Sequence, residues 1–174
     1  AKETEMFYTQ KMINEVMAES ARLGVYAHFG DGAHFDDGVQ FGNGAQFSDG
    51  AQFGNGAQFG NGAQFGNGTR FGVGTRFGVG TRFGDYAQFG EGARFGNDAQ
   101  FGDDAWFGDN ARFGDYARFG EGAQFGDDAQ FGKLARFGEG ALFDNNARFG
   151  EGTWFGEGAR FGANCQMLRW TTLK

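Results

Sequence analysis

The sequence predicts an all-β solenoid preceded by a single α-helix, and two observations carry that prediction. Apart from Phe7, every phenylalanine stands on one lattice with a spacing of six residues, from Phe29 to Phe161, without insertion or deletion. Two positions before each of these phenylalanines the residue is small, most often alanine. A strict period of this kind indicates one short structural unit that is stacked many times.

Each six-residue unit reads as a short strand followed by a corner. In an extended chain, residues two apart share a face, so the small residue and the phenylalanine both point inward. The residue between them points outward and is usually Gln, Arg or His. The Gly-x-Gly that follows predicts a bend, because glycine adopts positive φ without steric cost. One unit cannot bury its phenylalanine alone, so neighbouring coils must complete the core.

The unit resembles that of the hexapeptide-repeat family: a large apolar residue, Gly, two free positions, a small residue and one more. The resemblance covers Leu23 to about Lys174, and it implies a left-handed parallel β-helix with three hexapeptides, hence 18 residues, in each coil. From Leu23 to Gln166 there are 144 residues, or 24 units, which gives eight such coils. The family prefers Leu, Ile or Val where this chain has Phe, so a flat coil of only two hexapeptides is the alternative.

The first 22 residues read differently from the repeat and predict a helix. Apolar residues recur there at helical spacing: Met6, Ile13, Val16, Met17 and Ala21. Arg22 in the last turn and Gly24 just beyond it are typical of a helix end. We expect a helix from about Lys2 to Arg22 and a repeat domain over residues 23–174. The helix either caps the first coil, whose strand edges would otherwise be unpaired, or serves oligomerisation or docking.

Composition excludes several classes of partner. A net charge of −7 argues against a nucleic-acid-binding protein, because such proteins carry basic stripes. No apolar run approaches the ~18 residues of a membrane span, so no membrane partner is expected. The polar start, Ala1 to Glu5, is unlike a signal peptide. The single Cys165 excludes an intrachain disulfide and is either a small apolar group or an intermolecular bridge.

The sequence predicts no catalytic, cofactor-binding or metal site. Enzymes of the resembled family use a catalytic His, and some hold a metal with three His, whereas this chain has only His28 and His34, both at outward positions. No insertion interrupts the repeat to build a substrate pocket. The acidic corner residues lack the nine-residue period of calcium-binding rolls, so we expect them to serve solubility and weak ion pairing with nearby arginines.

One corner of the predicted rod collects large apolar side chains. The column lies three positions after the lattice residue and is read every 18 residues; it contains Tyr26, Tyr116, Leu134 and Trp170, and Val25 and Val79 flank it. Apolar side chains gathered on one strip of a polar surface indicate an interface. We expect this strip to join rods side by side, and the family resemblance implies a homotrimer.

These observations favour a non-enzymatic structural protein, a rigid rod displayed on a larger assembly through its N-terminal helix or an end coil. Such rods resemble decoration or fibre proteins of phage particles, which implies the virion or the cytoplasm of the producing cell as its location. The alternative is an acyltransferase-like enzyme of the hexapeptide-repeat type. A loop that leaves the coil would distinguish the enzyme from the rod.

Overall fold

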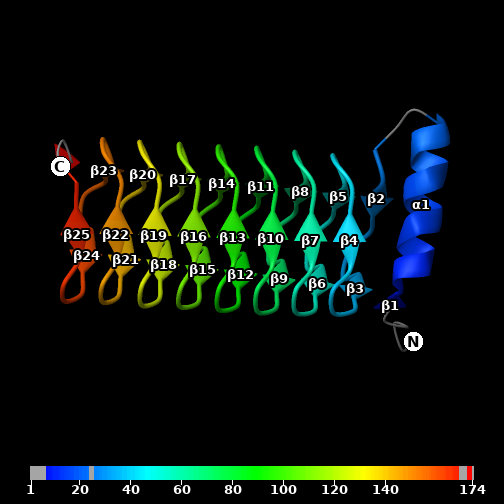
Figure 1. The fold of residues 1–174 in the computed structure, drawn as a ribbon, viewed down its shortest axis with the longest axis horizontal. Coiled ribbons are helices and arrows are strands. Elements are labelled where there is room, and N and C mark those ends of the chain that lie inside the picture. Colours follow the sequence, from blue (N-terminus) through cyan, green and yellow to red (C-terminus); the bar gives the residue numbers. More distant parts are fainter. Residues whose placement is uncertain (1–6, 24–25, 169–171, 174) are drawn as a thin grey trace.

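A computed structural model of the protein shows a three-sided rod with a helix lying across its N-terminal end (Figure 1). The structure describes residues 7–23, 26–168 and 172–173. Within these ranges the chain forms parallel sheets of nine, eight and nine strands, and each strand has two residues. We call the three sides face A, face B and face C.

The strands of each face lie along the rod in chain order. Face A consists of β1 (Phe7–Tyr8), β3 (His34–Phe35), β6 (Gln52–Phe53), β9 (Arg70–Phe71), β12 (Gln88–Phe89), β15 (Trp106–Phe107), β18 (Gln124–Phe125), β21 (Leu142–Phe143) and β24 (Arg160–Phe161). Face B consists of β2 (His28–Phe29), β5 (Gln46–Phe47), β8 (Gln64–Phe65), β11 (Arg82–Phe83), β14 (Gln100–Phe101), β17 (Arg118–Phe119), β20 (Arg136–Phe137), β23 (Trp154–Phe155) and β26 (Thr172–Leu173). Face C consists of β4 (Gln40–Phe41), β7 (Gln58–Phe59), β10 (Arg76–Phe77), β13 (Arg94–Phe95), β16 (Arg112–Phe113), β19 (Gln130–Phe131), β22 (Arg148–Phe149) and β25 (Gln166–Met167).

The pairing register confirms the coil of three hexapeptides. From β2 onward the chain visits faces B, A and C in turn, and each strand as far as β23 pairs with the strand three places further on, whereas β1 pairs with β3. Phe77, for example, lies opposite Phe59 on one side and Phe95 on the other. The fold is therefore a parallel β-solenoid of about eight turns with three faces per coil, and the flat coil of two hexapeptides is excluded.

The phenylalanine lattice points inward, as the sequence predicts. The ring of Phe95 stacks on Phe77 and Phe113 of the same face, at centroid distances of 4.8 and 4.9 Å. It also meets Phe89 of the next face edge to face at 4.9 Å. Stacked and edge-to-face contacts are the two favoured geometries of aromatic pairs. One ring type therefore fills the whole core, and the small inward residue beside it leaves the space that the rings need.

The corners are held by a ladder of Asn and Asp side chains. The side-chain oxygen of Asn43 accepts the backbone N–H of Asn61 at 2.8 Å, and Asp85 accepts that of Asp103 at 2.9 Å, one coil further on. Gly102 is needed beside this contact, because a Cβ there would meet the Asp85 carboxylate. Among the described residues the sole ion pair joins Arg22 to Glu19. Seven corner aspartates act as acceptors in this ladder, namely Asp37, Asp49, Asp85, Asp103, Asp109, Asp115 and Asp127. The expected ion pairs between corner acids and arginines are not formed in the described part of the chain.

The helix starts later than the sequence predicts. Helix α1 spans Gln10–Leu23, whereas Phe7 and Tyr8 form β1 and pair with β3. Tyr8 takes the place of a phenylalanine below the first coil, since its ring stacks on Phe35 at 5.0 Å. The part of the expected helix before Phe7 lies outside the described residues. Leu23 ends the helix with 59% of its side chain exposed, so it is not the first core residue of the lattice.

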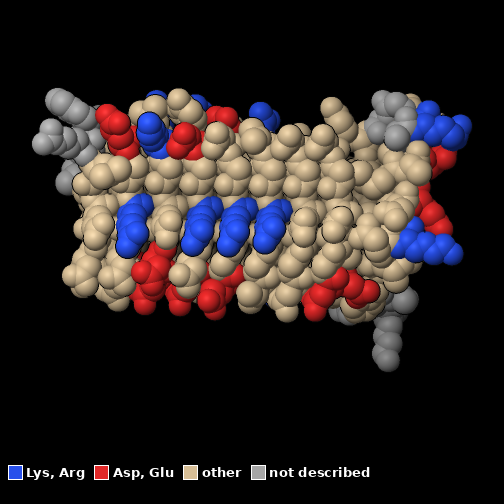
Figure 2. Space-filling view, viewed as in Figure 1, with Lys and Arg blue, Asp and Glu red and all other residues tan. Residues whose placement is uncertain are grey.

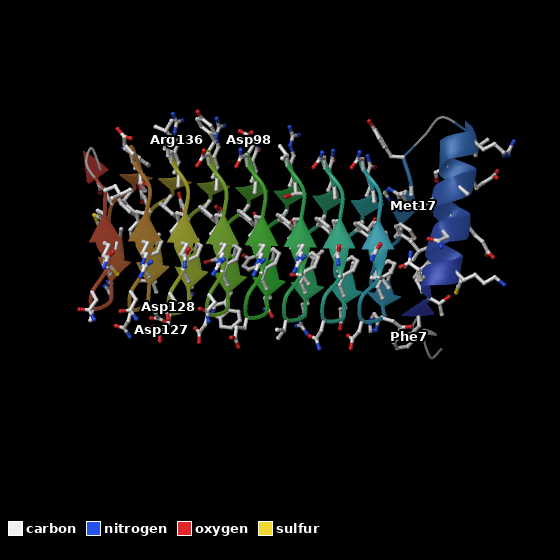
Figure 3. The ribbon with its side chains drawn as sticks, in the orientation of Figure 1. Phe7, Met17, Asp98, Asp127, Asp128 and Arg136 are labelled. Carbon is white, nitrogen blue, oxygen red and sulfur yellow. The ribbon has the colours of Figure 1, made fainter. Side chains whose placement is uncertain are left out.

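Helix α1 covers the first coil through its apolar side. Ile13 is fully buried in the core, and Val16 and Met17 pack against it. Figure 3 shows Met17 on the side of α1 that faces the first coil. The side-chain amide of Gln10 accepts the N–H of Gln40 at 2.7 Å and donates to its carbonyl oxygen at 3.1 Å. This amide takes the place of a neighbouring strand at the edge of face C. No helix in the described residues has the length and apolar character to span a bilayer.

Candidate interaction surfaces

Four of the six predicted interface residues lie on one long edge of the rod. This edge, where the chain turns from face C to face B, is called the CB corner. Tyr26, Val79, Tyr116 and Leu134 lie on it with 67%, 47%, 49% and 45% of their surface exposed. Val25 and Trp170 fall outside the described residues. The structure thus brings Tyr116 and Leu134 together on adjacent coils, with Tyr26 and Val79 further along the same edge.

Two of these residues have an unfavourable backbone conformation. Tyr116 and Leu134 have φ of 62° and 57°, in the left-handed region, at a position where four other coils have glycine: Gly44, Gly62, Gly80 and Gly152. A left-handed conformation costs an L-residue roughly 1–2 kcal/mol, and only Asn and Asp tolerate it well. The Leu134 side chain lies across Gly152, whose added Cβ would be 2.5 Å from Cδ2 of Leu134. Tyr86, at the corner between faces B and A, has a φ of 61° as well, so what sets Tyr116 and Leu134 apart is that two exposed, strained apolar residues stand on adjacent coils of one edge.

Face A carries a second apolar surface, which the sequence prediction did not include. Trp106 and Leu142 project from it with 49% and 37% of their surface exposed, two coils apart, with Gln124 between them. They line a shallow groove of about 440 Å³. Val73 and Tyr86 are exposed at the two edges of the same face. The outward column contains Trp and Leu where Gln or Arg is usual, and this was the signal in the sequence.

Basic side chains gather on the two faces that meet at the CB corner. They are Arg76, Arg94, Arg112 and Arg148 on face C and Arg82, Arg118 and Arg136 on face B. Figure 2 shows a row of basic side chains along face C and acidic side chains along the lower edge. The CB corner itself adds Lys133 but also Asp98, Asp115 and Glu151. This side of the rod therefore has a positive balance.

Acidic side chains gather at the two corners that border face A. The corner between faces A and C carries Asp36, Asp37, Glu91, Asp109, Asp127, Asp128 and Asp144. The corner between faces B and A carries Asp31, Asp49, Asp85, Asp103, Asp104, Glu121, Glu139 and Glu157. Figure 3 shows Asp127 and Asp128 at the long edge opposite Asp98 and Arg136. Arg70 and Arg160 are the basic residues of face A, so this side is strongly negative.

The two histidines and the cysteine have local structural partners. His28 Nε2 lies 3.1 Å from the hydroxyl of Ser48, and His34 is half-buried against the ring of Phe7 at a centroid distance of 5.1 Å. They stand on different faces, B and A. In the described part of the chain no group of three or more His, Cys, Asp or Glu residues could hold a metal ion. Cys165 is a half-buried free thiol that donates to the Asp144 carbonyl at 3.5 Å.

In comparisons with known proteins, the chain matches no protein-family model and no curated protein. The resemblance to hexapeptide-repeat proteins therefore rests on the six-residue unit and on the three-sided coil. The function has to be argued from the surfaces of the rod.

Proposed function

We propose that this protein is a non-enzymatic structural rod, displayed on a larger assembly, and that copies associate side by side through the CB corner. The observation that carries the proposal is the pair Tyr116 and Leu134, both exposed and both in a left-handed conformation that glycine would adopt more cheaply. A phage decoration or fibre protein is the kind of assembly component that fits, and a homotrimer is the closed form that the resemblance favours.

The regularity of the coil supports a structural role. From β2 to β25 every corner has the same length, and the backbone of each coil is hydrogen-bonded to the next coil. With roughly 4.8 Å between adjacent strands, eight coils span about 38 Å. Each coil contacts only its neighbours, so the rod gains length without changing its cross-section.

The same regularity weighs against the acyltransferase-like alternative. An enzyme pocket usually encloses most of its ligand and gathers a few convergent polar groups. Over residues 26–168 no loop projects from the coil, and the groove on face A is shallow and open along the rod. His28 and His34 lie on different faces and do not converge on a common site.

Replacing Leu134 with Asp tests the role of the CB corner. A carboxylate in an apolar contact between rods should dissociate the assembly, because the charge loses its hydration without gaining a partner. The coil should persist, since Asp98 and Asp128 already occupy the equivalent corner position with φ of 60°. Asn146→Asp is the matched control, with the same added charge and a similar φ of 63° on another corner.

Sedimentation velocity of the parent and both variants gives the assembly state, and circular dichroism reports the fold. We expect an associated parent, an associated Asn146→Asp control and a monomeric Leu134→Asp variant with an unchanged spectrum. A parent that is monomeric at high concentration, or a Leu134→Asp variant that stays associated, contradicts the proposal.

A further inference from the structure

We infer that the CB corner of one copy docks onto face A of a second copy, so that rods join into an open series and do not close into a ring. This inference rests on the proposed side-by-side association and names the surface that receives the corner. Its occupant is a second copy of this chain, and shape, charge and symmetry each support that choice.

The apolar residues of the rod divide between two opposite sides. Tyr116 and Leu134 project from the CB corner, and Trp106 and Leu142 project from face A. The two sets occupy the same stretch of the rod, because Tyr116 follows Trp106 within one coil and Leu134 lies in the next coil. The groove on face A, of about 440 Å³ and lined by Trp106 and Leu142, is large enough to receive the exposed Leu134 side chain of a second copy. A hollow of similar volume borders Leu134 on its own rod, with Arg136, Gly152 and Trp154 in its lining.

The charges on the two sides have opposite signs and the same spacing. Seven arginines flank the CB corner on faces B and C, whereas the two corners that border face A are acidic. Within the part of the chain that the structure describes, neither set forms an ion pair. Both sets follow the coil spacing of roughly 4.8 Å, with gaps at Gln100 and Gln130 among the arginines and, for example, at Asn67 and Val73 among the acidic corners. Docked in register, the arginines of one rod therefore face carboxylates of the other over several coils.

This charge complementarity selects the occupant. A polyanion such as a nucleic acid would bind the arginines, but it offers nothing to Leu134 and is repelled by a chain of net charge −7. A second copy offers an apolar groove to the apolar corner, and its acidic borders face the arginines on either side of that corner. Electrostatic attraction of this kind also fixes the register and speeds the encounter.

Symmetry decides that the series is open. In a three-sided rod, each corner lies opposite a flat face, and the face opposite the CB corner is face A. The two docking surfaces therefore point in opposite directions. A copy that receives a corner on its face A keeps its own corner free, and the next copy is added by translation. Such a heterologous contact does not close, in contrast to the homotrimer that the family resemblance implies.

Two double variants separate the surfaces. The corner variant combines Tyr116→Gly with Leu134→Gly, and the face variant combines Trp106→Gln with Leu142→Gln. Each introduces a residue that the rod already uses at equivalent positions, glycine at Gly152 and glutamine at Gln124, so the coil should be preserved. Met12→Gln on the exposed side of α1 is the control for loss of an apolar surface residue.

We expect the parent and Met12→Gln to sediment as a series of species that grows with concentration. Each double variant should be monomeric, with its association constant lowered at least about tenfold. An equimolar mixture of the two variants should form a one-to-one dimer and nothing larger, because only one functional contact is left. Raising the salt concentration should weaken association of the parent. If a double variant loses its circular dichroism signal, the single changes Leu134→Asn and Leu142→Gln replace it.

Four results overturn the inference and are distinguishable. A single closed trimer of the parent, or a face variant that associates like the parent, overturns the docking on face A but leaves side-by-side association through the corner intact. A mixture that stays monomeric while the parent associates does the same. A parent that is monomeric throughout overturns both the inference and the proposed function.

Discussion

The first coils of the rod and the later ones share a core but not a surface. From β2 to β8 the outward residues are His or Gln, and from Gly32 to Gly80 the left-handed position of each corner is glycine. From β9 onward the outward residues include Arg, Trp and Leu, and the corners admit Tyr, Leu, Asp and Asn at positive φ. The ring stacking does not change: Phe53 lies 4.9 Å from Phe71, and Phe95 lies 4.9 Å from Phe113.

This difference shows that the core does not determine which residues stand at the outward positions. Inward and outward residues alternate along each strand, so a coil folds with Gln, Arg or Trp outside as long as the phenylalanine and its small neighbour are inside. The first coils show what folding alone requires. What the later coils add, namely the arginines, Trp106, Leu142, Tyr116 and Leu134, has to be explained by what the surface contacts.

The largest expected effect tests whether the two regions share one core. Phe53→Ala and Phe95→Ala should each lower the free energy of unfolding by about 3–5 kcal/mol, because both open a cavity between stacked rings. Phe95→Asp should prevent folding, since it buries a charge without a partner. Urea denaturation followed by circular dichroism measures the change. A Phe53 variant that loses far less stability than the Phe95 variant breaks the comparison, and a stable Phe95→Asp protein shows that the lattice does not point inward.

A smaller effect is expected in the coil where the first region passes into the second. Thr69, Thr75 and Thr81 occupy its three inward small positions, fully buried, with hydroxyls that have no hydrogen-bond partner among the described residues. Thr75→Val removes a buried unpaired hydroxyl at constant shape, so the free energy of unfolding should rise by about 1 kcal/mol.

Thr153 provides the matched control for that change. It is also fully buried, but its hydroxyl donates to the carbonyl oxygen of Gly150 at 2.7 Å. Thr153→Val should therefore lower the free energy of unfolding by about 1 kcal/mol. Thermal and urea unfolding of both variants gives the two signs. If Thr75→Val lowered the free energy of unfolding as well, the threonine hydroxyls of that coil would have a hydrogen-bond partner after all.

The smallest effect concerns the histidines of the first coil. Replacing His28 and His34 with Gln, the residue of neighbouring coils, should change stability and association by less than about 0.5 kcal/mol, the usual range for surface changes. The double change removes the ring contact of His34 with Phe7 and the hydrogen bond between His28 and Ser48. Unfolding and sedimentation of the double variant check this. A large loss of association would place a functional surface in the region where we expect none.

The sequence predicts stacked coils of constant length, and the pairing register then decides between three hexapeptides and two in each coil. A lattice without insertions, from Phe29 to Phe161, is compatible only with stacked coils of constant length. The start of the helix could not be read in the same way. Tyr8 belongs to a strand because it pairs with Phe35, a contact between distant parts of the chain that local spacing does not reveal. The Asn and Asp ladder likewise depends on the distance between coils.

The sequence predicts one of the two candidate surfaces, the CB corner, and not the other, face A. Reading one corner once per coil places Tyr26, Tyr116 and Leu134 on one edge, and the structure has all three exposed there, with Tyr116 and Leu134 on adjacent coils and Tyr26 further along. That this edge is an interface stays a prediction. The same reading of the outward column places Trp106 and Leu142 on one face. That pattern is weaker, because Gln124 interrupts it and single exposed apolar residues are common on protein surfaces. The left-handed backbone conformation of Leu134 was not predicted from the sequence, because φ at a corner follows from the coil geometry.

The spacing also means that insertions or deletions of two different lengths have different effects on the rod. Gain or loss of three hexapeptides together changes its length by one coil and leaves each downstream side chain on its own face. Gain or loss of a single hexapeptide keeps every phenylalanine on the lattice, yet it shifts the phase of all that follows by one face. Leu142 would then part from Trp106, and the arginines of face C would move to another side. Such a shift leaves the core unchanged. The fold therefore tolerates any change in length by a multiple of one hexapeptide, whereas the surface pattern is kept only by changes of three hexapeptides at a time.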